Sequence, residues 1–202
     1  MDLQSMRQLV ARHNLQSGRA VLAALLCAFG AAALALAILV GSALAAGNLL
    51  ANGSFEKDSD GDGEPNGWVR SDFGGILPKR VCNQAYVGSC SFKYIYDGLN
   101  KSTQQVISPL AGNSSETYTL TIWVKGKEID LGAVSPRVGL YFHQVDGGSD
   151  SNYVLLAAGT TAWTKLTVST TSTEAFDYVY VVISAVADGG KAWFDKVKLV
   201  GP

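Results

Sequence analysis

The stretch from Asn52 to Trp68, NGSFEKDSDGDGEPNGW, holds five of the chain's seventeen acidic residues. Oxygen-bearing side chains alternate with other residues along it, and glycines follow two of the aspartates. Alternate side chains of such a loop converge on one calcium ion, and glycine permits the sharp turn. The residues that would hold the ion occupy positions 1, 3, 5 and 9 of an EF-hand-type loop: Asp58, Asp60, Asp62 and Asn66.

A complete EF-hand is excluded, because position 12 is Val69, where a bidentate glutamate belongs. The sequence around the loop also shows no helical periodicity. Two interpretations remain open. The loop is either a shorter calcium loop, similar to those of thrombospondin type 3 repeats, or a solvated acidic turn, in which Asp and Gly are common anyway.

Catalysis by these carboxylates is disfavoured. Glycoside hydrolysis needs one carboxyl group with a raised pKa in an apolar pocket, and this loop is polar and rich in glycine. After residue 47 there is one histidine, His143, and neither a G-x-S-x-G nor an H-E-x-x-H motif. We therefore expect a protein that is not an enzyme, with a small hydrolase as the least favoured alternative.

The N-terminal segment, residues 1–46, predicts export. Three arginines and one acid precede residue 20, no charge follows up to residue 46, and Ala43 and Ala45 form an A-x-A cleavage pattern. The alternative is an uncleaved signal anchor, because the apolar stretch 21–40 is long enough to span a bilayer. In both cases we expect residues 47–202 to be secreted or held at the extracellular surface, with membrane attachment only through residues 20–46.

The exported part is of ordinary size for one domain. It carries 13 Lys and Arg against 16 Asp and Glu, a net charge of about −3, with no basic stripe along the sequence. Nucleic acid is therefore a poor candidate partner. Cys82 and Cys90 are its only cysteines, and export predicts a disulfide between them. The alternative is a pair of buried free thiols.

Strand patterns dominate this part. Residues 117–125 (TYTLTIWVK) and 137–143 (RVGLYFH) alternate between apolar and other side chains, and Gly-, Asp- and Ser-rich breaks separate further β-rich runs. The alternation turns Trp123 and Lys125 outward on the first run, and Tyr141 and His143 on the second. Eight to ten short strands at this spacing predict an antiparallel β-sandwich, and a jelly roll is the simplest way to close it.

The order of short motifs from residue 48 to 200 resembles that of galactose-binding-like jelly-roll domains, above all the carbohydrate-binding modules attached to xylanases and related glycoside hydrolases. The motifs are NLLANGSFE (48–56), DGEPNGW (62–68), GSCSF (88–92), QQV (104–106), YTLTIWVKG (118–126), AWTKL (162–166) and AWFDKVKL (192–199). The resemblance implies a structural calcium ion that joins the first and last strands through Glu56 and Asp195. Lys196 stands where the family pattern has a second aspartate, which leaves that ligand set incomplete.

For ligand binding we expect aromatic side chains on a sheet surface, because sugars present flat apolar C–H faces. If the two outward-facing runs lie in one sheet, Trp123, Tyr141, His143 and Lys125 would line a single face. The alternatives are that Trp123 packs under a loop and that Tyr141 fills a second layer. The remaining tryptophans lie in fold-signature motifs and are expected to pack structurally: Trp68, Trp163 and Trp193.

The sequence thus predicts a monomeric, non-catalytic carbohydrate-binding-like domain for a polysaccharide or oligosaccharide, stabilised by calcium and one disulfide. A surface structural or adhesion module without glycan binding is the alternative.

Overall fold

The computed structural model describes residues 47–202, apart from residues 73 and 133. The predicted signal peptide or anchor, residues 1–46, lies outside the described residues. In the described part, no helix is long and apolar enough to cross a membrane.

The described residues form ten strands and no α-helix. The strands are β1 (Val69–Asp72), β2 (Lys79–Val81), β3 (Ser91–Ile95), β4 (Lys101–Ile107), β5 (Thr117–Asp130), β6 (Val134–Gln144), β7 (Ser149–Leu155), β8 (Gly159–Thr171), β9 (Phe176–Val186) and β10 (Gly189–Val200).

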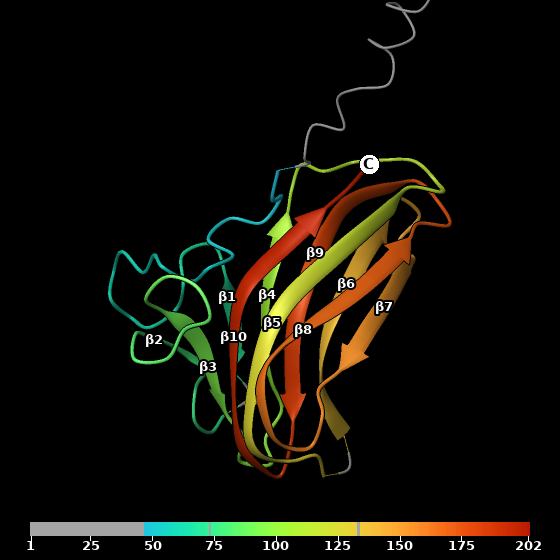
Figure 1. Ribbon diagram of the computed structural model, residues 1–202. Helices are drawn as coiled ribbons and strands as arrows, with labels where there is room; N and C mark the ends of the chain where they lie inside the picture. The colour runs from blue at the N-terminus through green and yellow to red at the C-terminus, as the bar shows by residue number, and fades with distance from the viewer. Residues whose placement is uncertain (1–46, 73, 133) are drawn as a thin grey trace, which may run out of the picture. The chain divides into compact units, whose positions relative to one another are not determined.

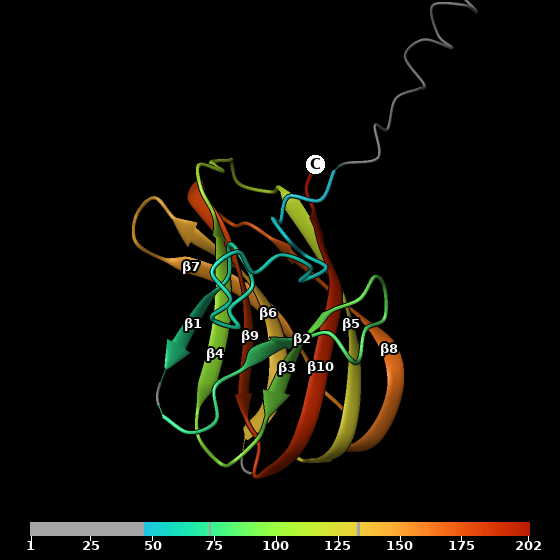
Figure 2. The same ribbon diagram turned by 90° about the vertical axis from the view of Figure 1, so that its left-hand side faces the viewer.

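The strands form two five-stranded antiparallel sheets. Sheet A has the order β1-β4-β9-β6-β7, and sheet B has the order β2-β3-β10-β5-β8. Figure 1 looks onto sheet B, with β10, β5 and β8 in front of the strands of sheet A. In Figure 2 the two layers are seen from the side. The prediction of an all-β, two-sheet antiparallel sandwich is confirmed.

The core lies between the sheets and follows the alternation of the strands. On β5, Leu120 and Ile122 are buried, and on β9, Val179, Val181 and Ile183 are completely buried. Each such side chain contributes roughly 1.5–3 kcal/mol when it is fully removed from water. Because successive residues of a strand point to opposite faces, this burial fixes which side chains each sheet presents to solvent.

The opening stretch also contributes to the core. Phe55 packs against Trp68 with ring centroids 5.2 Å apart, and against Phe92 with centroids 5.5 Å apart. Trp68 is 2% exposed, so its predicted structural role is confirmed. The backbone before it is tied to the last strand, since Leu49 N–H donates to the Leu199 carbonyl at 3.0 Å.

Residues 47–202 contain both sheets and their whole shared core, and Ala46–Pro202 forms one compact unit. We therefore expect this unit to fold when it is expressed by itself.

Tyr94 of β3 links the two sheets through a buried polar contact. Its hydroxyl oxygen lies 2.7 Å from Thr103 Oγ1 on β4 and 3.0 Å from the Ile183 carbonyl oxygen on β9. Tyr94 is completely buried, and this burial raises the pKa of its hydroxyl well above the ordinary value. The hydroxyl therefore remains a hydrogen-bond donor at neutral pH.

We predict that Tyr94→Phe lowers the free energy of unfolding by about 1–3 kcal/mol, because it leaves buried polar groups without their partner. Urea denaturation measures the change. Tyr153→Phe, at a residue 49% exposed on β7, is the matched control and should leave stability unchanged. Equal stability of the two variants would contradict a cross-sheet role for the Tyr94 hydroxyl.

Candidate functional site

The four residues predicted to contact a ligand do not lie on one face. Trp123 and Lys125 belong to β5 of sheet B, whereas Tyr141 and His143 belong to β6 of sheet A. All four point away from the core, and the outward faces of two packed sheets point in opposite directions. The single face expected from the sequence is therefore wrong, and the two pairs belong to separate surfaces.

Trp123 is covered by a loop, which is one of the alternatives that the sequence left open. Tyr86, from the segment between the two cysteines, stacks on Trp123 with ring centroids 3.8 Å apart and planes 14° apart. Lys196 Nζ lies 5.7 Å from the centre of the Tyr86 ring, and the Trp163 ring lies 5.8 Å from it at a steep tilt. Tyr86 thus occupies one face of the Trp123 ring, where a sugar would otherwise stack.

Lys125 lies over another tryptophan of the same sheet. Its Nζ is 5.9 Å from the centre of the Trp193 ring, and Lys93 Nζ is 5.8 Å from it. Trp193 is only 8% exposed, so it serves as a buried support beneath two ammonium groups. The predicted packing role of Trp193 agrees with this arrangement.

Sheet A instead presents a cluster of rings on its central strands, which we call the aromatic face: Tyr141, His143, Tyr178 and Tyr180. Tyr141 of β6 and Tyr180 of β9 are register partners, with centroids 4.9 Å apart and planes 12° apart. His143 and Tyr178 are also register partners and stack at 4.4 Å and 9°. Two parallel ring pairs therefore lie side by side on neighbouring strands.

The aromatic face also offers hydrogen-bonding groups. Within the part of the chain that the structure describes, the hydroxyls of Tyr141, Tyr178 and Tyr180 have no hydrogen-bond partner. Burial, together with the two neighbouring tyrosines, raises the pKa of Tyr180, so it stays a donor at neutral pH. His143 Nδ1 donates to Asp177 Oδ1 at 2.8 Å, which fixes the orientation of the imidazole.

Glycine and serine residues lie beside these rings on β6 and β7. Gly139 precedes Tyr141 on the same face, and a Cβ atom there would lie 2.5 Å from the Tyr141 ring. The register partners of Tyr141 and His143 on β7 are Ser151 and Ser149, which are too small to cover the far sides of the rings. The side chains directly opposite the two rings on β7 are therefore small, and the next outward position of β7 is Tyr153, opposite Gly139.

Sequence reasoning missed Tyr178 and Tyr180. The signal for their direction was present, because the apolar alternation of Val179, Val181 and Ile183 turns both tyrosines outward. The pairing of β9 with β6, which brings them against Tyr141 and His143, was not visible in the pattern.

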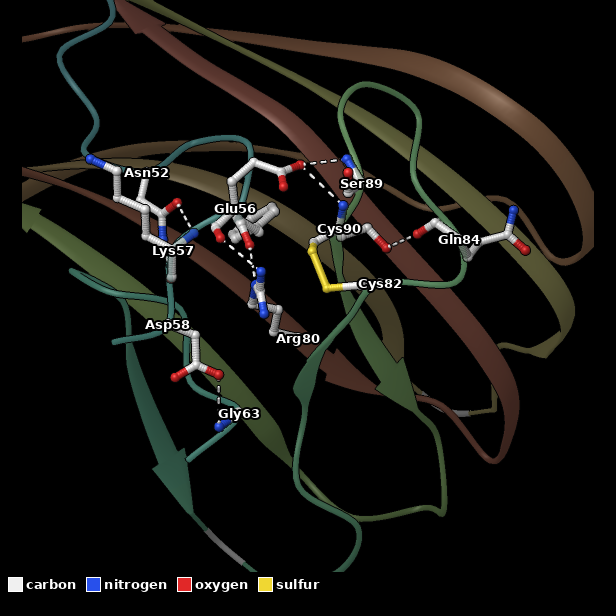
Figure 3. The surroundings of a disulfide bond; sticks show 12 residues. Asn52, Glu56, Lys57, Asp58, Gly63, Arg80, Cys82, Gln84, Ser89 and Cys90 are labelled. Atoms are coloured by element: carbon white, nitrogen blue, oxygen red, sulfur yellow. Dashed lines mark hydrogen bonds between the residues drawn. A yellow bond between two sulfur atoms is a disulfide. The ribbon is translucent and has the colours of Figure 1, made fainter. Parts of the chain in front are cut away.

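The three aspartates of the acidic loop do converge. Carboxylate oxygens of Asp58, Asp60 and Asp62 all lie within 4.8 Å of one another. Asp58 accepts the backbone N–H groups of Gly61 at 2.9 Å and Gly63 at 3.1 Å, and the second of these bonds is drawn in Figure 3.

The rest of the loop has polar anchors as well. Asn66 Oδ1 accepts the Ser59 N–H at 2.8 Å, and Arg70 binds the carboxylates of Asp62 at 3.2 Å and Glu64 at 2.6 Å. Asp60, Asp62, Glu64 and Asn66 contribute to the lining of a cavity of about 350 Å³. The loop thus has the hard oxygen atoms that calcium prefers.

Glu56 and Asp195 both bind the loop that the disulfide Cys82–Cys90 closes. Glu56 Oε1 accepts the N–H groups of Ser89 at 2.9 Å and Cys90 at 3.0 Å, as Figure 3 shows. The predicted disulfide is therefore present, and Glu56 holds the backbone beside it.

Asp195 holds the other side of the same loop. Its Oδ2 accepts the N–H groups of Tyr86 at 2.7 Å and Val87 at 2.9 Å. Burial raises the pKa of the Asp195 carboxyl against the opposing effect of its backbone N–H donors, and the nearby charge of Glu56 adds to the rise. Asp195 thereby positions the Tyr86 backbone, and so the ring that covers Trp123.

An arginine side chain reaches the backbone next to Glu56. Arg80 Nε donates to the Phe55 carbonyl at 2.8 Å, and Arg80 Nη2 donates to the Glu56 carbonyl at 2.7 Å. A guanidinium group thus binds carbonyl oxygens that a calcium ion could otherwise use here. A guanidinium group also binds Asp62 in the acidic loop, so the difference between the two places is that three carboxylates converge in the acidic loop.

The sequence matches no protein-family model and no curated protein. Solved structures do match. A family 16 carbohydrate-binding module is 25% identical with a TM-score of 0.55, over 76% of this chain and 99% of that one. The module TmCBM61, solved with β-1,4-galactotriose, is 18% identical with a TM-score of 0.51, over 77% of this chain and 99% of that one.

The same fold occurs in enzymes. The enzymatically active domain of bacteriophage CBA120 tailspike protein 4 is 15% identical with a TM-score of 0.59, over 77% of this chain, but this chain covers only 21% of that protein. Cyclases from Fischerella also share the fold at 14% identity. The two modules, which this chain matches over nearly their whole length, show that the domain resembles carbohydrate-binding modules in structure.

Proposed function

We propose that the domain is a non-catalytic carbohydrate-binding module that holds a neutral oligosaccharide or polysaccharide on the aromatic face. The observation that carries the proposal is the pair of stacked rings from neighbouring central strands, Tyr141 with Tyr180 and His143 with Tyr178. The predicted export of residues 47–202 would place this face where extracellular glycans occur.

Ring and hydroxyl chemistry together suit a sugar. The apolar C–H face of a pyranose packs on aromatic carbon, and its hydroxyls need hydrogen-bond donors and acceptors at the edge of the ring. The hydroxyls of Tyr141, Tyr178 and Tyr180 supply both. The likeness to a family 16 module over nearly its whole length, and to a module solved with an oligosaccharide, supports the proposal.

The surroundings of the carboxyl groups argue against glycoside hydrolysis. Asp195 has a raised pKa, but it is completely buried and its oxygens accept backbone N–H groups of the disulfide loop. Asp60 and Asp62 lie in an exposed loop. Neither arrangement places a protonated carboxyl beside an accessible sugar, as glycoside hydrolysis requires.

We predict that Tyr180→Ala weakens binding of a neutral glycan to residues 46–202 at least about tenfold, because one stacked pair and one hydroxyl are lost. A glycan array identifies the ligand, and isothermal titration measures the affinity. Gly139→Ala should also weaken binding, since the added methyl group displaces the Tyr141 ring without removing it.

Trp123→Ala, on sheet B, is the matched control and should bind the same glycan with unchanged affinity, after circular dichroism confirms its fold. Loss of binding in this variant with retention in Tyr180→Ala would move the glycan to the other sheet. An array without any bound glycan would favour the alternative, a surface structural module.

We also propose that the acidic loop binds a structural calcium ion through Asp58, Asp60 and Asp62, with Asn66 beside them. The convergence of the three carboxylates supports the proposal. An ion bound only by the folded state stabilises that state by mass action. Affinity suited to millimolar extracellular calcium is expected from so exposed a loop.

Chelation is predicted to lower the melting temperature of residues 46–202, and added calcium to restore it. Calcium at 100 times its dissociation constant would stabilise the fold by about 2.7 kcal/mol. Asp60→Asn should abolish the calcium response, whereas Glu56→Gln should keep it. The reverse result would assign the ion to Glu56 and Asp195, and the absence of any response in the unmodified chain would remove both sites.

A further inference from the structure

The outward surface of sheet B gathers most of the cationic side chains of the domain. We call this surface the lysine face, and its residues are Lys79, Lys93, Lys125, Lys127, Lys165, Lys191, Lys196 and Lys198. Cross-strand register puts them on one side of the sheet, because residues directly opposite each other share a face. Lys79 opposes Lys93 across β2 and β3, and Lys191 opposes Lys127 across β10 and β5.

Lys198 lies opposite Thr121, and Lys196 Nζ lies over the Tyr86 ring; two tryptophans place the remaining two lysines. Trp193 lies opposite both Lys93 and Lys125, and Trp123 lies opposite Lys165. All eight lysines are exposed or half-buried. The face therefore spans all five strands of sheet B, from β2 at one edge to β8 at the other.

These ammonium groups are not neutralised by the protein. Among the described residues, no lysine of this face lies within ion-pair distance of a carboxylate. Burial lowers the pKa of Lys93, and the like charges of Lys191 and Lys79 lower it further. Asp195 is the acid within this surface and is buried, while Glu128 and Asp130 lie at its border, at the end of β5.

The sequence shows no basic stripe, but the folded domain has a basic surface on sheet B. The lysines are spread over five strands, and several of them alternate with buried side chains, so no basic run appears along the chain. Eight of the 13 Lys and Arg of residues 47–202 collect on one sheet, although the net charge is about −3. The remaining surface is correspondingly acidic.

We propose that the lysine face binds an acidic polysaccharide whose carboxylates repeat along an extended chain. Neighbouring strands lie about 4.8 Å apart, a distance close to the length of one pyranose unit. The row of register partners across β2, β3, β10 and β5 is Lys79, Lys93, Trp193 and Lys125, so a glycan crossing these strands would meet an ammonium group on three of the four. The rings below, Trp193 under Lys93 and Lys125, supply a rigid apolar support for the lysine stems.

Two other polyanions suit this surface less well. Single-stranded nucleic acid needs aromatic faces open for base stacking, whereas Trp123 is covered by Tyr86 and Trp193 by two lysines. Stable binding to a membrane surface needs apolar side chains that enter the lipid, and the exposed Tyr86 at this face is already stacked on Trp123. Both polyanions are included in the test.

The probe is polygalacturonate, with fully methyl-esterified polygalacturonate as the uncharged control of the same backbone. Residues 46–202 should bind the acid form at low ionic strength and should lose most of that binding in about 0.5 M salt, since salt screens exposed charges. The esterified form should not bind the Tyr180→Ala variant, in which the proposed neutral-glycan site is impaired. Failure to bind polygalacturonate at low salt, or equal binding of both forms by this variant, would overturn the proposal.

Matched double variants locate the surface. Lys165→Gln/Lys191→Gln should weaken binding about fivefold, because each exposed ion pair contributes modestly. Lys57→Gln/Arg137→Gln removes the same net charge from elsewhere and should leave affinity unchanged. Equal weakening in the two variants would overturn the proposal, because binding would then follow net charge alone.

Binding measurements with two other polyanions test whether the ligand is an acidic glycan. A single-stranded oligonucleotide and phosphatidylserine vesicles should bind more weakly than polygalacturonate at equal ionic strength. Equal or tighter binding of either, with the same dependence on Lys165 and Lys191, would overturn the assignment to an acidic glycan. Tyr180→Ala should retain polygalacturonate binding, so this proposal and that of the neutral-glycan site succeed or fail separately.

Discussion

The burial of one face of each sheet is the constraint on which the rest of this structure depends. Strands such as β5 and β9 place every second side chain in a shared core, and that core contains the fully buried Val179, Val181 and Ile183. Because the side-chain period of a strand is two, a slip of one residue would turn the whole outward set inward. The apolar residues that stabilise the fold therefore also determine which side chains a ligand can meet.

The two outward surfaces that result are chemically different. Sheet A carries tyrosines and a histidine in stacked pairs, and their hydroxyls have no partner within the described residues. Sheet B carries lysines above tryptophan rings that are already covered. The two-layer sandwich thus presents an aromatic surface on one side and a cationic surface on the other. The core keeps the two apart, so each can be altered by substitution without change to its opposite.

The disulfide loop shows how buried carboxylates shape one of these surfaces. Asp195 accepts the N–H groups of Tyr86 and Val87, and Glu56 accepts those of Ser89 and Cys90. Two acids that resemble metal ligands in sequence thereby hold a backbone loop, and that loop places Tyr86 on Trp123. The resemblance of short motifs predicted the fold correctly. The roles of the individual residues depend on neighbours that are distant in the chain.

The sequence by itself determined much of the fold: the strands with clear alternation, the inward or outward direction of most of their side chains, the structural role of Trp68 and the pairing of Cys82 with Cys90. The strands and the side-chain directions depend on local alternation, the role of Trp68 on its place in a recurring motif, and the disulfide on the predicted export. Only the tertiary structure decided which strands are neighbours. It separated Trp123 from Tyr141, brought Tyr178 and Tyr180 beside Tyr141 and His143, and collected scattered lysines on sheet B. The physical reason is that strand order arises from long-range backbone pairing and core packing, and neither leaves a signal in the period-two pattern of a single strand.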